Sequence, residues 1–183
     1  MEDEKIVALY WARDPDAIRH TAEKYGGLCG RIAGSLLGDA RDAEECVSDT
    51  YQRTWDSVPP SRPVQLAAYL GRIVRNLCLS RYRAGRAQKR YGGMEQMLEE
   101  LEECLPGRES VEQELEAKEL SAFLDRWLGT LGKEDRALFV RRYWYGDSVS
   151  ALAKERGKTA NQVSLRLYRM RQGLREQLER RED

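Results

Sequence analysis

Side chains that can contact nucleic acid recur along residues 159–171 at the spacing of one helix face. An apolar stripe starts at Val163 and returns at every third or fourth position, so the other face is expected to pack on a core. Asparagine and arginine can read base edges, leucine can touch a thymine methyl group, and flanking arginines can hold phosphates. The candidate contacts are Thr159, Asn161, Gln162, Ser164, Leu165, Arg166, Tyr168, Arg169 and Arg171. The alternative is a basic amphipathic helix that only packs.

A shorter helical pattern precedes this face. Val149, Leu152 and Ala153 form its inner side. Gly157 tolerates the positive φ of a tight turn, and Thr159 can cap the helix that follows. Two helices joined in this way are typical of a helix-turn-helix, in which the first helix braces the second and the second presents its N-terminal residues to base edges.

A second basic segment covers residues 57–94, which carry eight basic and no acidic residues. Its arginines are interleaved with Tyr69, Tyr82 and Tyr91, and cations combined with aromatic rings fit single strands or unstacked bases. The alternative is a solvated basic helix, since the formal net charge of the chain is zero. Residues 95–119 carry ten acidic and two basic residues. Such segregation of charge indicates separate surfaces for separate partners.

The sequence offers little material for catalysis. The single histidine, His20, has no nearby serine, cysteine or metal-ligand partner in sequence, and no phosphate-binding loop, dinucleotide fingerprint or nucleophile elbow occurs. The glutamate-rich residues 95–119 lack the alternating loop ligands of a calcium site, which favours a solvated acidic face. We therefore expect no catalytic residue, no metal and no cofactor.

The cysteines and the N-terminus indicate a reducing compartment. The four cysteines form no CxxC pair, and Cys46 and Cys78 fall on apolar helical stripes, which favours reduced core residues. The N-terminus is acidic and lacks the pattern of a signal peptide. No apolar run approaches the roughly 18 residues that a membrane helix needs. These features predict a cytoplasmic protein without membrane insertion.

Helical periodicity over most of the chain predicts an all-α fold of two small domains joined by an acidic linker. The expected helices of the first domain cover residues 4–12, 16–37, 39–55 and 64–90, with Asp39 as a cap and the prolines of SVPPSRP as a stop. The second domain is expected to hold four helices, two of them near residues 120–131 and 133–143. The predicted boundaries are 1–92 for the first domain, 93–111 for the linker and 112–183 for the helix-turn-helix domain. Within the linker, MEQMLEELEECL has the composition of a short helix.

Three stretches in their order along the chain resemble bacterial RNA polymerase sigma factors of the extracytoplasmic-function type in the sigma-70 family. They are LLGDARDAEECVSDTYQRTWDSV, LAAYLGRIVRNLCLSRYRAGRAQKR and LGTLGKEDRALFVRRYWYGDSVSALAKERGKTANQVSLRLYRMRQGLREQL. The resemblance covers nearly the whole chain from about residue 16, and the order and separation of the motifs carry it.

The resemblance implies a role for each surface. A helix of the first domain would dock on core RNA polymerase through Glu45, Ser48, Asp49 and Gln52. The first domain would also hold the opened minus-ten element of promoter DNA, through Arg62, Arg72, Arg75, Asn76, Arg81 and Arg83. The acidic linker would thread toward the active-site and RNA-exit channels of the polymerase, and the helix-turn-helix would read the minus-thirty-five element. Many proteins of this family are held inactive by an anti-sigma partner, which is therefore a further expected partner.

Three positions depart from the pattern of the family. Ser80 stands at a commonly acidic position after the Arg-Asn-Leu pattern, so a local ion pair is expected to be absent. Ser164 and Leu165 stand where its recognition helices often carry a lysine and a serine, so the base contacts of this helix differ.

Two other hypotheses compete with the hypothesis of a sigma factor. A stand-alone helix-turn-helix regulator would dimerise through its N-terminal domain and bind a palindromic duplex without polymerase. A DNA-processing enzyme would need a nucleophile together with a metal or arginine cluster in residues 1–92, where only the arginines are present.

Overall fold

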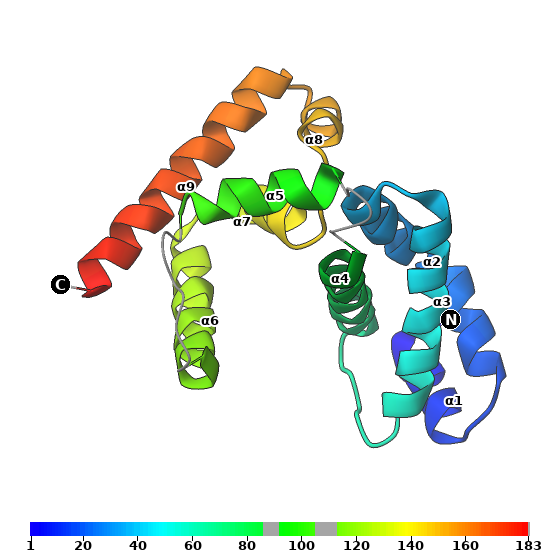
Figure 1. The fold of residues 1–183 in the computed structure, drawn as a ribbon. Coiled ribbons are helices and arrows are strands. Elements are labelled where there is room, and N and C mark those ends of the chain that lie inside the picture. The colour runs from blue at the N-terminus through cyan, green and yellow to red at the C-terminus, as the bar shows by residue number, and fades with distance from the viewer. Residues whose placement is uncertain (86–91, 105–112, 183) are drawn as a thin grey trace. The chain divides into compact units, whose positions relative to one another are not determined.

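The computed structural model describes residues 1–85, 92–104 and 113–182, and the regular elements within these ranges are all α-helices (Figure 1). The predicted all-α fold is thereby confirmed. The chain divides into two units, Met1–Glu95 and Gln96–Asp183, which are described one at a time. None of the helices in the described residues is long and apolar enough to cross a bilayer.

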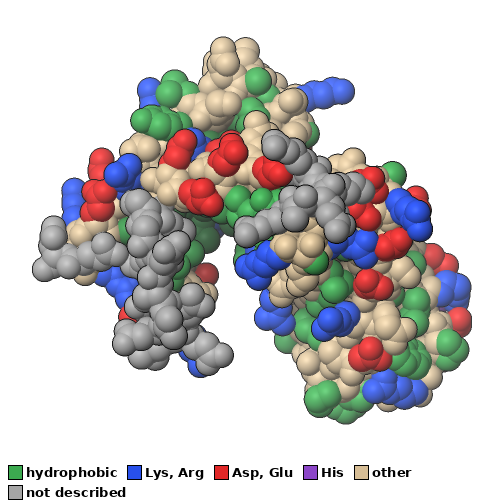
Figure 2. All heavy atoms as spheres, viewed as in Figure 1, with side chains coloured by type: hydrophobic (Ala, Val, Ile, Leu, Met, Phe, Trp, Pro, Cys, Tyr) green, Lys and Arg blue, Asp and Glu red, His purple; other side chains and the backbone are tan. Residues whose placement is uncertain are grey.

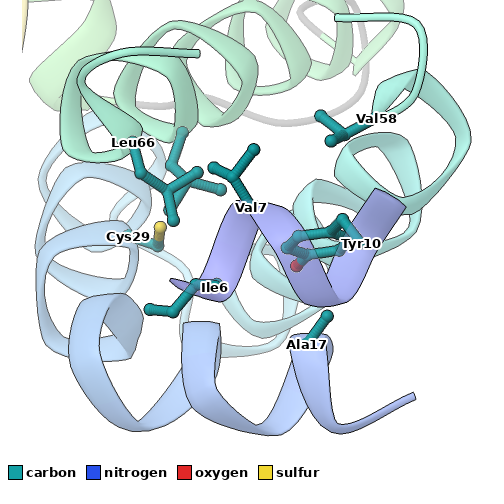
Figure 3. Packing of buried hydrophobic residues seen from close by; sticks show 8 residues of the cluster. Ile6, Val7, Tyr10, Ala17, Cys29, Val58 and Leu66 are labelled. Atoms are coloured by element: carbon teal, nitrogen blue, oxygen red, sulfur yellow. The ribbon is translucent and has the colours of Figure 1, made fainter. Parts of the chain in front are cut away.

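The first unit contains α1 (Asp3–Trp11), α2 (Asp16–Leu37), α3 (Ala40–Ser57) and α4 (Leu66–Gly85). Helices α2, α3 and α4 pack on one another, and α1 packs on α2. Figure 3 shows how α1 points three side chains into this core. The core cluster consists of Ile6, Val7, Tyr10, Ala17, Cys29, Val58, Leu66 and Leu70.

The boundaries of α3 and α4 follow from local chemistry. Gly38 adopts a left-handed φ of 68° and ends α2, and the Asp39 carboxylate then accepts a 2.9 Å hydrogen bond from the Asp42 amide to start α3. Helix α4 begins at Leu66, later than the expected start at residue 64. The reason is tertiary, because the Leu66 amide donates at 3.2 Å to the Asp3 carboxylate of α1. The expected end of this helix, residues 86–90, lies outside the described residues.

The second unit contains α6 (Gln113–Thr130), α7 (Lys133–Tyr143), α8 (Val149–Arg156) and α9 (Ala160–Glu182). Helices α8 and α9 form the predicted helix-turn-helix, and Gly157 between them has a left-handed φ of 62°. Leu138 and Phe139 of α7, Leu152 of α8 and Leu167 of α9 are buried. Phe139 also makes ring contacts with Trp127 and Tyr143, at centroid distances of 4.9 and 4.6 Å.

Helix α5 (Gly92–Glu102) begins in the first unit and ends in the second. Part of the segment expected as a linker is thus helical, and Met94, Met97 and Cys104 are buried. Residues 105–111 of that segment lie outside the described residues. The division into domains 1–92 and 112–183 with a linker between them stays a prediction.

The four cysteines are buried and free, which agrees with their assignment to the core. Burial raises the pKa of the Cys29 thiol to about 11, and it does the same for Cys104. Both thiols are therefore protonated at neutral pH and behave as packing residues.

Gly93 is required by its surroundings within the first unit. A Cβ atom at this position would lie 2.2 Å from the backbone oxygen of Ser35. We expect Gly93→Ala to lower the free energy of unfolding of the first unit by about 1–3 kcal/mol, because backbone cannot yield as a flexible side chain can. Gly92→Ala is the matched control, since its Cβ would meet nothing within 4 Å. Thermal unfolding of the two variants checks this, and equal melting temperatures would contradict it.

Candidate nucleic-acid and partner surfaces

The start of α9 is fixed by a reciprocal pair of hydrogen bonds. The Gln162 amide donates to the Thr159 hydroxyl at 3.2 Å, and the Thr159 amide donates to Oε1 of Gln162 at 2.9 Å. This arrangement is a capping box, which satisfies two backbone donors that the helix itself leaves open. Thr159 therefore caps the helix as predicted. Both side chains, which were also predicted to contact DNA, serve here to hold the N-terminus of α9 in place.

The outer face of α9 presents most of the predicted DNA contacts to solvent. Leu165 and Tyr168 are 49% and 47% exposed, so both can be reached from solvent. The exposed predicted residues are Thr159, Asn161, Gln162, Ser164, Leu165, Arg166, Tyr168 and Arg169. Because Val163 and Leu167 are buried, the apolar stripe and the polar face divide as expected from the spacing.

A hollow of about 510 Å³ adjoins this face within the second unit. Four cationic side chains line it, together with a single acidic one. Its lining residues are Glu134, Leu138, Arg156, Lys158, Gln162, Val163, Leu165, Arg166 and Arg169. A concave surface with an excess of positive charge attracts phosphates.

Two arginines of α9 are bound within the protein. Arg166 makes an ion pair with Asp135 of α7, although its side chain is partly exposed. Arg171 is only 7% exposed and donates to the Tyr143 hydroxyl at 2.6 Å. The assignment of Arg171 as a phosphate contact is therefore corrected, because the flank of α9 on which it lies is covered by other side chains.

Tyr143 and Arg171 belong to a buried polar network. Arg142 binds both carboxylate oxygens of Glu100 in α5, with Nη2 to Oε1 at 2.8 Å and Nε to Oε2 at 3.2 Å. The Tyr143 hydroxyl donates to Oε2 of Glu100 at 2.8 Å, and Arg171 lies 3.6 Å from the same atom. Burial by itself would raise the pKa of Glu100, but the hydrogen bonds from Arg142 and Tyr143 and the charge of Arg171 hold that pKa below its ordinary value.

In the first unit, α3 and α4 enclose a second hollow, of about 470 Å³. It brings together two of the predicted minus-ten residues, Arg72 and Asn76, with Tyr69, whose ring lies 5.7 Å below the Arg72 guanidinium. Its lining residues are Arg53, Ser57, Tyr69, Arg72, Ile73, Asn76, Leu77 and Ser80, with no acidic side chain among them. An aromatic ring, a guanidinium and an amide around one hollow fit an unstacked base.

The other predicted minus-ten residues lie elsewhere. Arg75 is half-buried, and burial lowers the pKa of its guanidinium. Arg81 pairs with Asp42 at 3.1 Å and with Glu45 at 2.8 Å, both on α3. Arg83 is exposed near the end of α4.

The four residues predicted to bind polymerase share one exposed stripe of α3. They are Glu45, Ser48, Asp49 and Gln52. Glu45 is tied to Arg81 of α4, whose hydrogen bond and charge lower the pKa of the carboxylate. Gln52 donates to Asp56 at 3.0 Å along the same helix. The stripe is thus a mixed acidic and polar surface, and the ion pair between Glu45 and Arg81 connects it to α4.

Sequence analysis overlooked two residues beside the predicted minus-ten surface. Trp11 is 40% exposed, and the guanidinium of Arg62 lies 4.6 Å from the centre of its ring. Arg53 lines the hollow between α3 and α4. A lone tryptophan at the end of α1 carries no positional signal, whereas the alignment of α3 against α4 could have indicated Arg53.

Comparison with known proteins finds one matching family model and several similar proteins. Residues 21–88 match the family model described as sigma-70 region 2, which covers α3, α4 and most of α2. Similar curated proteins are the ECF RNA polymerase sigma factors SigL of Mycobacterium tuberculosis strains, 26% identical over 169 residues and covering 86% of each chain. Among solved structures, that of CnrH in complex with the cytosolic domain of CnrY is 21% identical, with a TM-score of 0.45 and 97% of each chain covered.

Proposed function

The chain belongs to the extracytoplasmic-function sigma factors of the sigma-70 family and acts in transcription initiation, and from this premise we propose that it binds core RNA polymerase and directs it to a two-part promoter. The observation that carries the proposal is the hollow between α3 and α4. It lies inside the matched segment and combines Tyr69, Arg72 and Asn76 without an acidic side chain.

In the proposed mechanism, the first unit captures bases that become unpaired when the duplex opens. A base can stack on the Tyr69 ring or on the Arg72 guanidinium plane, and the Asn76 amide can hydrogen-bond to its edge. The exposed Arg62 and Arg83 supply positive charge for the backbone of the strand. Binding energy gained only from unpaired bases favours the open state over the duplex, which is what promoter opening requires.

The second unit is proposed to bind the upstream promoter element as a duplex. The capping box fixes the N-terminus of α9, so its first turns can enter the major groove as one rigid piece. Asn161 and Arg169 are the candidates for base edges, and Leu165 can contact a thymine methyl group. Arg166 can contact a phosphate only after its ion pair with Asp135 breaks.

Core polymerase is proposed to bind the exposed stripe of α3 that carries Glu45, Ser48, Asp49 and Gln52. The acidic segment after the first unit would then follow the channels of the polymerase, where its negative charge suits a basic lining. An anti-sigma partner that covers these surfaces is part of the same proposal.

Run-off transcription with a cognate core polymerase on a library of promoter fragments tests the proposal. Transcripts that depend on this chain and start at a fixed distance from a shared two-part motif are the expected result. A chain that binds a palindromic duplex alone, and neither binds polymerase nor yields transcripts, would instead be a stand-alone regulator.

Arg169→Ala is expected to weaken recognition of the upstream element by about 1–3 kcal/mol, because it removes an exposed cation that can reach a guanine edge. Binding to duplex promoter fragments that contain or lack the upstream element measures the effect. Arg180→Ala, on the exposed far end of the same helix, is the control. An equal loss for both variants on both fragments would show that Arg169 contributes only charge.

A further inference from the structure

The carboxylate of Glu100 in helix α5 contacts two other helices of the second unit. Glu100 accepts hydrogen bonds from Arg142 of α7 on both of its oxygens, and Tyr143 donates to one of them. Arg171 of α9 lies 3.6 Å from Glu100, and it lies equally close to the carboxylate of Glu103. The side chains of Arg142 and Arg171 are only 4% and 9% exposed, so this receptor for a carboxylate is largely shielded from water.

The side of α5 that carries Glu100 is also its buried side. Met97 and Cys104 are each 1% exposed, on the side that carries Glu100. Glu99, Glu102 and Glu103 are exposed, and acidic side chains gather over α5 in Figure 2. The segment is thus an acidic amphipathic helix that buries an apolar side and partly buries one carboxylate.

The arginines on the α7–α9 face need an acidic partner such as the one α5 provides. Two largely buried guanidinium groups need an anionic acceptor, because burying an uncompensated charge is costly. Glu100 supplies it in the bidentate geometry that suits Arg142. The face formed by Arg142, Tyr143 and Arg171 is therefore shaped and charged for a carboxylate on an apolar helix.

We infer that this face is a docking surface for α5 that is occupied in the free protein and vacated when the chain binds core polymerase. The inference rests on the proposed function, in which the acidic segment follows channels of the polymerase. A segment cannot occupy a polymerase channel and the α7–α9 face at the same time. Only chains in which α5 is undocked can bind core polymerase. The apparent association constant is therefore the intrinsic one multiplied by the undocked fraction.

The test compares Glu100→Gln with Glu102→Gln in the full chain. Both changes remove one negative charge from α5, but only Glu100 faces the docking surface, whereas Glu102 is exposed. The first readout is the rate at which a maleimide labels Cys104, resolved from the other cysteines by peptide mass spectrometry. The second is the dissociation constant for core polymerase. Hydrogen exchange of α8 and α9 verifies that the helix-turn-helix stays folded.

For Glu100→Gln we expect Cys104 labelling to accelerate by about tenfold or more, and the dissociation constant for core polymerase to fall by up to about the same factor. Glu102→Gln is expected to leave both values near those of the unchanged protein. Unaltered labelling of Cys104 in Glu100→Gln would refute docking through this carboxylate. Faster labelling with unchanged or weaker polymerase binding would refute the release step.

Failure of the proposed function has a different signature. In that case the unchanged chain itself fails to bind core polymerase, which removes the release step as well. The labelling of Cys104 still decides whether Glu100 holds α5 on the α7–α9 face.

Discussion

Arg142→Ala is expected to lower the free energy of unfolding of the second unit by about 3 kcal/mol, because it removes a buried side chain with its hydrogen bonds and leaves Glu100 with only Tyr143 and Arg171 as partners. Arg142 is 3% exposed and binds both oxygens of Glu100, and its Nη1 also donates to the backbone oxygen of Asp147 at 3.1 Å. Its removal therefore weakens the attachment of α5 and the connection between α7 and α8 together.

Thermal unfolding followed by circular dichroism measures this effect, and the melting temperature of the second unit should fall by more than about 10 °C. Arg180→Ala is the control, because Arg180 is exposed and surface substitutions of this kind usually change stability by within about 0.5 kcal/mol. A change of similar size in both variants would show that the buried Arg142 adds no more stability than an exposed arginine.

The helices were predictable because each buries one stripe at a regular spacing. The stripe positions of α9 are all buried, so periodicity separates its packed face from its exposed face; they are Val163, Leu167, Met170, Leu174 and Leu178. Local end signals also worked, since Asp39, Gly157 and Thr159 occupy the cap and turn positions assigned to them.

Residues on the flank of a stripe were not predictable in the same way. Arg171 follows Met170 and precedes Leu174, and its spacing is compatible with either a surface or a buried position. Its burial depends on Tyr143 and Glu100, which are 28 and 71 residues away. Arg81 and Arg166 likewise have acidic partners far along the chain, on α3 and α7. A basic residue near a helix face predicts positive charge, but only the packing of other helices decides whether that charge is free to bind DNA.

The interpretation of the acidic segment changed for a related reason. Its composition predicts a solvated linker, because residues 95–119 carry ten acidic residues and only two basic ones. However, Met97 and Glu100 share the packed side of α5, and Cys104, just after the helix, is buried as well. A glutamate on the packed side of a helix contradicts the apolar pattern unless its cationic partner is known, and that partner lies on α7.

Arg72→Ala is expected to reduce formation of the open promoter complex by about 5- to 100-fold, since stacking contacts with unpaired bases contribute about 1–3 kcal/mol each. Arg72 is exposed, lines the hollow between α3 and α4, and lies over the Tyr69 ring. Affinity for core polymerase should stay unchanged, because the proposed polymerase surface lies on α3. Permanganate reactivity of thymines near the start site measures opening, and a binding titration with core polymerase measures docking.

Arg19→Ala is the control for this variant. Arg19 is also an exposed arginine of the first unit, and its contacts with Asp16, His20 and Glu23 all lie on the surface of α2. On a template with a premelted minus-ten region, the defect of Arg72→Ala should shrink, since the cost of separating the strands has been removed in advance. An Arg72→Ala protein that loses polymerase binding and still opens promoters in preformed complexes would place Arg72 in the polymerase interface. The hollow would then have to hold something other than an unpaired base.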